Sequence, residues 1–489
     1  MRLFVFLIII VLAELCTTPY LKPVWAYEED AANNNTMPLT IEEAVNMAIE
    51  NNFSIKVNKY KSESANAQII VEESEFDPSL NIDLKQSVDK LQYISSDGGQ
   101  DERLTELDTA IGGKFFTGTE YELSFNNKRY ESSSYSLLIN PYYSTNFALT
   151  LTQPLIKNFG IDVQTTQINV AKNKYQISNL DFDTKVIEIA AKTAKAYWNL
   201  KIAQYRLNSE NVALELALHS QKQVSAKIEA GLLPAVDIYA ADSEVASRQE
   251  TLIDAKKDVL NAEDEVKQLL GINTWHYKIN TVSEPTLTVE TKDEATLIKK
   301  ALKIRQDYRK TEIEKKNKEL LLNYYKNQKL LDVDAFASFE VNGMGDDYPA
   351  AFEKISPDDK HYWLLGLSMN VPIGNRKNKG NYLAAKYNLN ETVASLKELE
   401  RNITQEVRAA LREVEYANKR VSAAQKTLIA AKQNLDAKEG KLNEGLSTLN
   451  EVLQSQKEYA TALYEEKKAV ADLSISAIEL KKTQGLLPY

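Results

Sequence analysis

The chain has 489 residues, of which 43% are hydrophobic and 26% charged, and its formal net charge is −10. This acidic balance excludes a nucleic-acid-binding protein, which needs a basic face. Glycine (16 residues) and proline (12 residues) are sparse for this length, which predicts few turns and long secondary-structure elements.

The N-terminus predicts an exported protein. An apolar run over residues 3–12 follows a single arginine and is too short to span a bilayer, but it has the length of a secretory signal core. Val24-Trp25-Ala26 supplies the small residue that signal peptidase needs before its cleavage site. We therefore interpret residues 1–26 as a signal peptide, with an uncleaved anchor as the alternative.

The single cysteine, Cys16, lies inside this segment. Lipidation at Cys16 is disfavoured, because the preceding Leu15 is bulkier than the small residue usually found there. Cleavage after Ala26 would leave a protein without disulfides, whose stability comes from packing or assembly. Residues 27–38 are polar and rich in turn formers, which predicts a disordered linker.

A first structural repeat is expected over residues 39–270. Thr40 and Glu43 have capping-box spacing and open a predicted helix over about 40–75. The hydrophobic period then changes to two over about 78–154, which predicts strands, with a hairpin turn at Phe116-Thr-Gly-Thr. A very long helix follows from Gly160 and is broken only by "AGLLPAVD", which predicts a helical hairpin with its tip near 231–237.

The same order of elements returns in the second half. Residues 271–290 form a short irregular or β connector, and a second repeat is expected over 291–489, ending in a C-terminal tail. Its predicted elements are a helix over about 293–327, strands over about 331–373, and helices over about 380–443 and 448–484, with a hairpin tip near 443–451.

Matching positions support an internal duplication. Pro154 and Pro372 each end a strand and open a long helix, and each is followed at nearly equal distance by a tip glycine, Gly231 or Gly445. Alignment of Ala48 with Ala301 in the lead helices leaves an excess in the first half, large enough for two extra strands. The turn at Phe116 is where these strands are expected.

Long helices of about 100 Å must pack along other helices. A soluble coiled-coil rod would satisfy them, but the strands argue against it. Each strand has one apolar and one polar face and about ten residues, which is typical of a membrane β-barrel. Open sheet edges cannot face lipid, so other copies of the chain should complete the barrel.

Aromatic residues near the strand ends fit the interface regions of a membrane: Tyr142, Tyr143, Tyr362 and Trp363. A soluble sandwich is the alternative for these strands.

The chain resembles the TolC-type outer-membrane efflux family over about 40–484. The resemblance rests on the duplicated plan, on the Gln153-Pro154-Leu and Val371-Pro372-Ile corners, and on the Gly-Leu-x-x-x-x-Asp and Gly-Leu-x-x-x-x-Glu tips. It implies a mainly α fold with membrane strands: a trimeric α-barrel topped by a transmembrane β-barrel, with an equatorial region that holds 271–290 and the C-terminal tail.

In this family each protomer gives four strands to a shared 12-stranded barrel. The extra hairpin departs from that pattern, and it either widens the barrel or decorates its outer end.

The resemblance also assigns roles to the two tips. The gate and pore candidates are Glu451, Asp237 and Gln454, and the adaptor-docking candidates are Gly231, Leu232, Gly445 and Leu446. Ser447 stands where the family often has a basic residue, so no locking salt bridge is expected from that position. Local capping explains Glu451 through Thr448, and a helix dipole explains Asp237, without any gate.

No enzyme chemistry or cofactor is expected. The three histidines, His219, His276 and His361, lack metal-ligand spacing. The sequence therefore predicts a passive outer-membrane duct with a long periplasmic extension, in a tripartite efflux or type I secretion system. The protein is expected to form a homotrimer in the lipid bilayer. Its other expected partners are a periplasmic membrane-fusion adaptor and an inner-membrane RND or ABC transporter. The alternative is a periplasmic coiled-coil adaptor or scaffold without channel activity.

Overall fold

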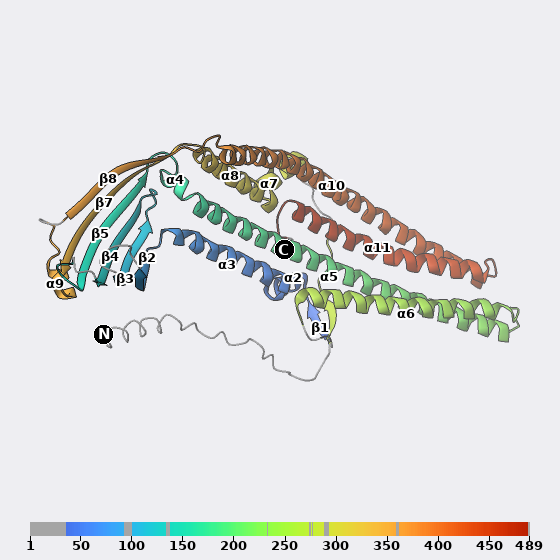
Figure 1. Cartoon of the computed structure of the whole chain (residues 1–489). Helices are drawn as coiled ribbons and strands as arrows, with labels where there is room; N and C mark the ends of the chain where they lie inside the picture. The colour runs from blue at the N-terminus through green and yellow to red at the C-terminus, as the bar shows by residue number, and fades with distance from the viewer. Residues whose placement is uncertain are drawn as a thin grey trace.

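The molecule has a curved sheet at one end and the tips of two long helical hairpins at the other (Figure 1). The computed structural model describes residues 36–91, 100–133, 137–231, 233–272, 275, 277–287, 293–357 and 361–487. The expected signal peptide, Cys16 and most of the expected linker lie outside the described residues. No helix among the described residues has a stretch both long enough and apolar enough to cross a membrane.

The first half carries two lead helices, the short strand β1, four strands of the large sheet and a long hairpin. In chain order its elements are β1 (Thr36–Leu39), α2 (Ile41–Asn51), α3 (Phe53–Glu73), the 3₁₀ turn η2 (Ser74–Phe76), β2 (Ser79–Leu91), β3 (Gln100–Lys114), β4 (Glu120–Ser132), β5 (Tyr142–Pro154), α4 (Ile161–Gln164), α5 (Thr166–Glu229) and α6 (Asp237–Leu270).

The second half repeats this order, with two strands of the large sheet in place of four. Its elements are β6 (Lys278–Thr281), α7 (Glu294–Ile304), α8 (Gln306–Asn327), β7 (Asp332–Gly345), α9 (Tyr348–Glu353), β8 (His361–Asn370), α10 (Arg376–Asn443) and α11 (Leu449–Thr483). The short helix α9 has no predicted counterpart. It begins where the Asp347 side chain accepts a hydrogen bond from the Ala350 N–H at 2.8 Å.

Each predicted lead helix is two helices. The first breaks at Asn52, which has an extended backbone and accepts a hydrogen bond from the Ser54 N–H. The second breaks at Arg305. The N–H of Asn52 donates to Ala48 at 3.0 Å and that of Arg305 donates to Ala301 at 2.9 Å. Ala48 and Ala301 therefore hold equivalent positions in the two repeats.

The expected disordered linker over 27–38 is wrong at its last residues. Thr36–Leu39 form β1, which pairs in parallel with β6 in the connector. Leu39 is 1% exposed, and its carbonyl oxygen accepts a hydrogen bond from the Tyr197 hydroxyl at 2.8 Å. Residues 27–38 as a whole are polar, which favours a linker over a strand. The strand β1 forms only by pairing with β6, which lies about 240 residues away in sequence.

Six antiparallel strands form one continuous sheet in the order β2-β3-β4-β5-β7-β8. The four strands per chain that the resemblance implies are therefore an undercount. The register aligns apolar side chains across the sheet, with Leu107 beside Leu84, Phe147 beside Phe125, and Trp363 beside Phe339. The opposite face is mainly polar, as period-two alternation requires.

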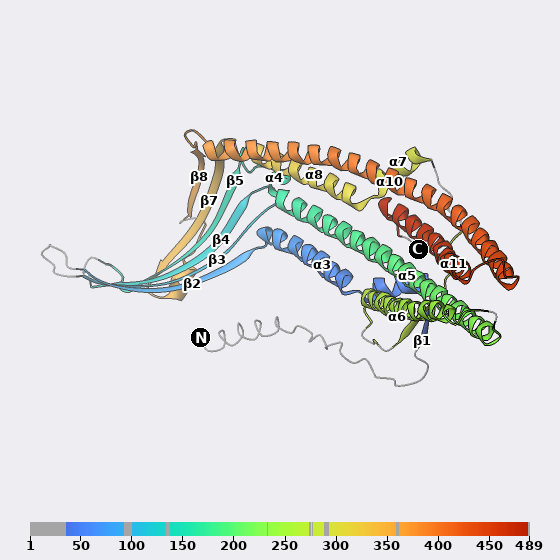
Figure 2. The same cartoon turned by 90° about the vertical axis from the view of Figure 1, so that its right-hand side faces the viewer.

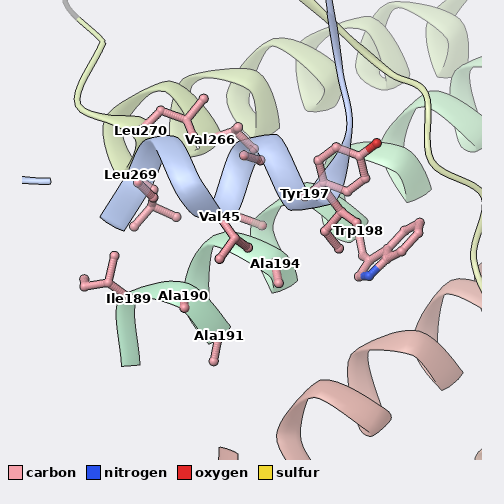
Figure 3. Close-up of a cluster of buried hydrophobic side chains, with 14 of the residues drawn as sticks. Val45, Ile189, Ala190, Ala191, Ala194, Tyr197, Trp198, Val266, Leu269 and Leu270 are labelled. Carbon is pink, nitrogen blue, oxygen red and sulfur yellow. The ribbon is translucent and has the colours of Figure 1, made fainter. Parts of the chain in front are cut away.

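Each repeat has its own apolar core at the middle of the molecule. In the first, α2 packs on α5 and the end of α6, where Val45, Ala194 and Leu270 are almost fully buried (Figure 3). In the second, α7 packs on α10, where Ala301 and Val407 are fully buried, and residues of α11 complete the cluster. Alanines on the long helices let the backbones approach closely, so each lead helix holds its hairpin in place.

The connector and the C-terminal tail lie against these cores. Lys201 of α5 donates to the Thr281 carbonyl oxygen of β6 at 3.0 Å, and the Ser283 N–H donates to the Tyr197 hydroxyl at 2.9 Å. Arg305 donates to the Thr483 carbonyl oxygen at 3.1 Å. The Gln306 side-chain amide donates to the Gly485 carbonyl oxygen at 3.3 Å. The connector is thus bonded to α5, and the C-terminal end of the chain is bonded to the break between α7 and α8.

Candidate channel entrance

The first hairpin tip is a glycine turn between two long helices. Gly231 follows the end of α5, has φ +75° and donates its N–H to the Ile228 carbonyl oxygen at 2.9 Å. A side chain at this position would meet no atom within 4 Å, so the turn requires glycine for its backbone angle and not for space. Leu232, a docking candidate, lies outside the described residues.

Asp237 is the first residue of α6. Its N–H donates to the Pro234 carbonyl oxygen at 3.1 Å, and its half-buried carboxylate lies in the first turn of the helix. The side chain of the N-cap residue, Val236, makes no capping hydrogen bond. A carboxylate in the first turn interacts favourably with the helix dipole, so Asp237 has a local role whether or not it faces a pore.

The second tip repeats the same turn. Gly445 has φ +76°, donates to the Leu442 carbonyl oxygen at 3.2 Å and has open space around it. Leu446 donates its N–H to the Lys441 carbonyl oxygen at 2.8 Å and leaves its side chain 72% exposed. An apolar side chain held outward by a fixed turn is suited to contact another protein.

Glu451 is the most heavily bonded side chain of this tip. Its N–H donates to the Thr448 hydroxyl at 3.3 Å, and its carboxylate accepts from the Thr448 N–H at 3.4 Å, which completes a capping box. The same carboxylate accepts from the Ser447 hydroxyl and forms an ion pair with Lys438 of α10 at 3.3 Å. The cation that pairs with this acid therefore comes from α10 and not from position 447.

These bonds lower the pKa of Glu451 below its ordinary value. The largest cause is the hydrogen bond from Ser447, followed by those from Lys438 and Thr448. All three partners favour the charged carboxylate. Glu451 thus carries its negative charge at the tip under neutral conditions.

Gln454 lies one turn further along α11 on the same exposed face. Its side-chain amide donates to Glu458 at 2.9 Å, and Glu451, Gln454 and Glu458 are all exposed. The spacing of three and four residues puts them in one stripe. The structure therefore brings Glu451 and Gln454 together, whereas Asp237 belongs to the other hairpin.

Buried polar bonds between the two hairpins are a feature that the sequence did not reveal. Ser220 of α5 bonds to the side chain of Gln456 on α11 at 3.0 Å, and the Ser209 hydroxyl donates to the Ala460 carbonyl oxygen at 2.6 Å. Ser209, Ser220 and Gln456 are each less than 10% exposed. The only sequence signal is a polar residue on a helix face with small neighbours, and this signal does not identify the partner.

Within the described part of the chain, no group of three or more His, Cys, Asp or Glu side chains could hold a metal ion. The arrangement at the tips offers charge, a turn and an exposed apolar side chain. Such a site can bind a partner or select ions.

The fold matches solved outer-membrane channels. The Campylobacter jejuni CmeC outer membrane channel superposes with a TM-score of 0.67 at 16% identity, over 91% of this chain and 85% of that chain. The Vibrio cholerae outer membrane protein VceC gives 0.66 at 13% identity, over 91% and 96%. The open state of the Neisseria gonorrhoeae MtrE outer membrane channel gives 0.64 at 15% identity, over 91% and 89%.

A family model for outer membrane efflux proteins matches residues 118–272 and 297–486, which together make up most of the chain. A search of curated proteins finds no match. The matched regions contain both hairpins and their tips, so the sequence-based expectation of an outer-membrane efflux channel that is not an enzyme is confirmed, and the alternative of an adaptor without channel activity does not hold. The chain belongs to the outer membrane efflux protein family and is a TolC-type channel of the outer membrane with a periplasmic extension.

Proposed function

We propose that this channel is the outer-membrane duct of a tripartite assembly, in which three copies of the chain join a periplasmic membrane-fusion adaptor and an inner-membrane RND or ABC transporter. TolC-type channels form trimeric efflux assemblies, which supports the homotrimer. The observation that carries this proposal is the pair of equivalent glycine turns, with Gly231 between α5 and α6 and Gly445 between α10 and α11. Figure 1 shows the tips of these two hairpins at the end of the molecule opposite the sheet.

The two tips are proposed as the adaptor-docking surface. The turn at Gly445 holds Leu446 in place, and most of the surface of the Leu446 side chain is exposed to solvent. In a cell that contains the cognate pump, Leu446→Ser should reduce export of a fluorescent dye several-fold. The single-channel conductance of the purified protein should stay unchanged, because the variant affects docking and not the duct. Equal loss of both would argue against a docking role.

The exposed stripe of α11 is proposed to line the entrance. Three copies of Glu451 around an axis would concentrate negative charge at a constriction and favour cations, and Gln454 would add an uncharged polar group beside each carboxylate. Asp237 is the corresponding candidate in the first hairpin. In planar bilayers, Glu451→Lys should lower the preference for cations over anions.

A matched control separates a pore position from general surface charge. Glu444→Lys makes the same charge change at the same tip but leaves the bonds to Ser447, Thr448 and Lys438 intact. We expect the ion selectivity of Glu444→Lys to remain close to that of the unmodified protein. If both variants shift selectivity equally, Glu451 does not line the entrance. If the purified, detergent-solubilised protein showed no conductance at all, its function as a duct would be contradicted.

A further inference from the structure

The hairpin β3–β4 is an integral part of the membrane sheet. It lies between β2 and β5, with thirteen residue pairs joining β2 to β3 and eleven joining β4 to β5. Its apolar residues continue the outward row of the neighbouring strands, as in the pairs Leu84–Leu107 and Leu123–Leu149. A hairpin that only decorated the outer end would not share this register.

The turn of this hairpin is also anchored at the helical end of the sheet. The Phe116 ring lies 4.5 Å from the Phe76 ring, and Lys114 forms an ion pair with Glu75 at 2.8 Å. Gly118 fits tightly, because a Cβ there would lie 2.8 Å from the Asn158 carbonyl oxygen. The hairpin thus spans the full height of the sheet and is tied to the junctions on both sides of it.

The sheet ends in two open edges within one chain, and they complement each other. β2 runs away from the helices and β8 runs back toward them, so β2 of one copy can pair with β8 of another in the antiparallel sense. Both edge strands carry exposed apolar rows, which include Leu84 at 75% and Leu365 at 71%. Unpaired backbone groups in lipid are costly, which makes closure by another copy the favoured solution.

The helices beside these edges carry exposed apolar side chains on both flanks of the chain. On the β2 side the exposed residues of α3 are Phe53, Val57, Tyr60, Ile70 and Val71. On the β8 side those of α10 are Leu383, Tyr387, Tyr416 and Ile429. Figure 2 shows α3 and α10 on opposite flanks of the chain, each on the side of its own edge strand. One interface between copies would therefore run along the sheet and the helices together.

The width of the sheet matches that of the helical layer below it. Four helices in the order α3-α5-α8-α10 lie beneath the sheet. At an interaxial distance of about 9 Å, four helices occupy about 36 Å of circumference. Six strands spaced about 4.8 Å apart and tilted by about 40° occupy about 38 Å, whereas four strands would occupy only about 25 Å.

We propose that three copies close a barrel of eighteen strands, six from each chain, in which β2 of one copy pairs with β8 of the next. This inference rests on the proposed trimer. At equal tilt, such a barrel is about 1.5 times as wide as one of twelve strands. The circumference of the β-barrel then matches that of the helical duct. The diameter of the opening at the hairpin tips, and not the diameter of the barrel, therefore limits the size of the cargo that passes.

Electron cryo-microscopy of the detergent-purified full chain tests the proposal directly. Three copies with eighteen strands are the expected result. Twelve strands with β3–β4 outside the wall would overturn the inference and leave the trimeric channel in place. A twelve-stranded barrel made of two copies would overturn the trimer as well.

Disulfide formation gives an independent readout in a Cys16→Ser background. Ser124 and Ala148 are register partners on β4 and β5, so the double cysteine variant should form a disulfide within one chain. Asn81 and Ala148 lie in the same row but three strand spacings apart, about 14 Å, which is too far for a disulfide. A disulfide from the second pair and none from the first would mean that β2 pairs directly with β5 and would refute the wider barrel.

A polymer-exclusion measurement checks the width. A variant that joins β2 to β5 by a short turn in place of residues 92–141 removes β3 and β4 and keeps β2 and β5 antiparallel. With polyethylene glycols added on the side of the sheet's outer loops, the unmodified channel should admit polymers about 1.5 times wider than this variant does. If the unmodified channel and the variant both conduct and exclude polymers of the same size, the proposal is contradicted. If the variant does not fold, the two disulfide pairs above test the proposal in its place.

Discussion

The glycines at the tips are required for a backbone reason alone. Gly231 and Gly445 both have φ near +75°, and a Cβ at either position would meet nothing within 4 Å. Gly440 is equally free of neighbours but lies inside the helix α10. Because neither Gly445 nor Gly440 is crowded, the two positions differ in backbone conformation alone, left-handed at Gly445 and helical at Gly440.

Alanine substitutions at Gly445 and Gly440 should have opposite effects. Gly445→Ala forces a left-handed conformation on an L-residue and should destabilise the tip by about 1–2 kcal/mol. Gly440→Ala should stabilise it by about 0.5–1 kcal/mol, since alanine loses less backbone entropy in a helix. Amide hydrogen exchange across 440–452 would measure both, and a loss of stability in both variants would contradict this account.

The acid at the second tip should make the local structure pH-dependent. Because the pKa of Glu451 is lowered by folding, its stabilisation is fully present above its ordinary pKa and is lost as pH falls through the lowered value. Glu451→Gln still accepts the capping bond but does not titrate, so it should flatten this dependence.

Hydrogen exchange in the first turn of α11, compared between pH 7 and pH 3, would show the effect. Glu43 is the matched control, because it forms the other capping box with Thr40 and its pKa is also lowered, chiefly by the hydrogen bond from the Thr40 backbone. Glu43→Gln should change exchange in α2 and leave α11 as it was. A pH dependence in α11 that survives Glu451→Gln would assign it to another group.

At the scale of elements, α9 is held on the sheet by two glycines of β7. A Cβ on Gly343 would lie 2.0 Å from the Ala351 carbonyl oxygen, and one on Gly345 would lie 2.6 Å from the Ala351 nitrogen. The ring of Phe352 lies edge-on to Phe125 at 6.4 Å, and Tyr348 lies edge-on to Tyr143 at 4.6 Å. The small residues of β7 let α9 pack directly on its backbone.

Gly343→Ala should therefore detach α9 while the sheet stays paired. The obstacle is backbone and cannot yield, unlike the obstacle at Gly366, where a Cβ would meet the tip of the Phe336 ring, which can rotate away. Limited proteolysis should cut near Lys354 at least several-fold faster in Gly343→Ala than in Gly366→Ala. Equal cleavage would mean that α9 does not depend on this close approach.

At the scale of the whole molecule, the two hairpins act together because α5 and α11 share buried polar bonds. Ser220→Ala removes one partner of the Gln456 amide in a buried position. The loss should weaken the contact between hairpins by about 1–3 kcal/mol. Hydrogen exchange in the first half of α11 should increase accordingly, while Ser243→Ala on the exposed face of α6 should leave it unchanged. No change in Ser220→Ala would show that the bond between Ser220 and Gln456 does not hold the two hairpins together.

Much of this architecture follows from local patterns. The period-two alternation from Leu80 to Leu84 and from Trp363 to Met369 indicates strands, because one face of each is apolar. The Gly231 and Gly445 turns are visible as the only breaks in long helical runs. The capping box at Thr448 and Glu451 is also visible in the sequence, because it depends only on two residues that lie three positions apart.

Other features depend on partners far apart in the chain, and only the tertiary structure decided them. The pairing of β1 with β6, the position of β3–β4 inside the sheet, the ion pair of Glu451 with Lys438 and the bond between Ser220 and Gln456 all join distant segments. Periodicity reports which face of an element is buried and not what covers it. The sequence by itself thus determined the elements, the duplication and the tips, whereas the six-stranded sheet and the contacts of the tips required the fold, because pairing is set by long-range packing.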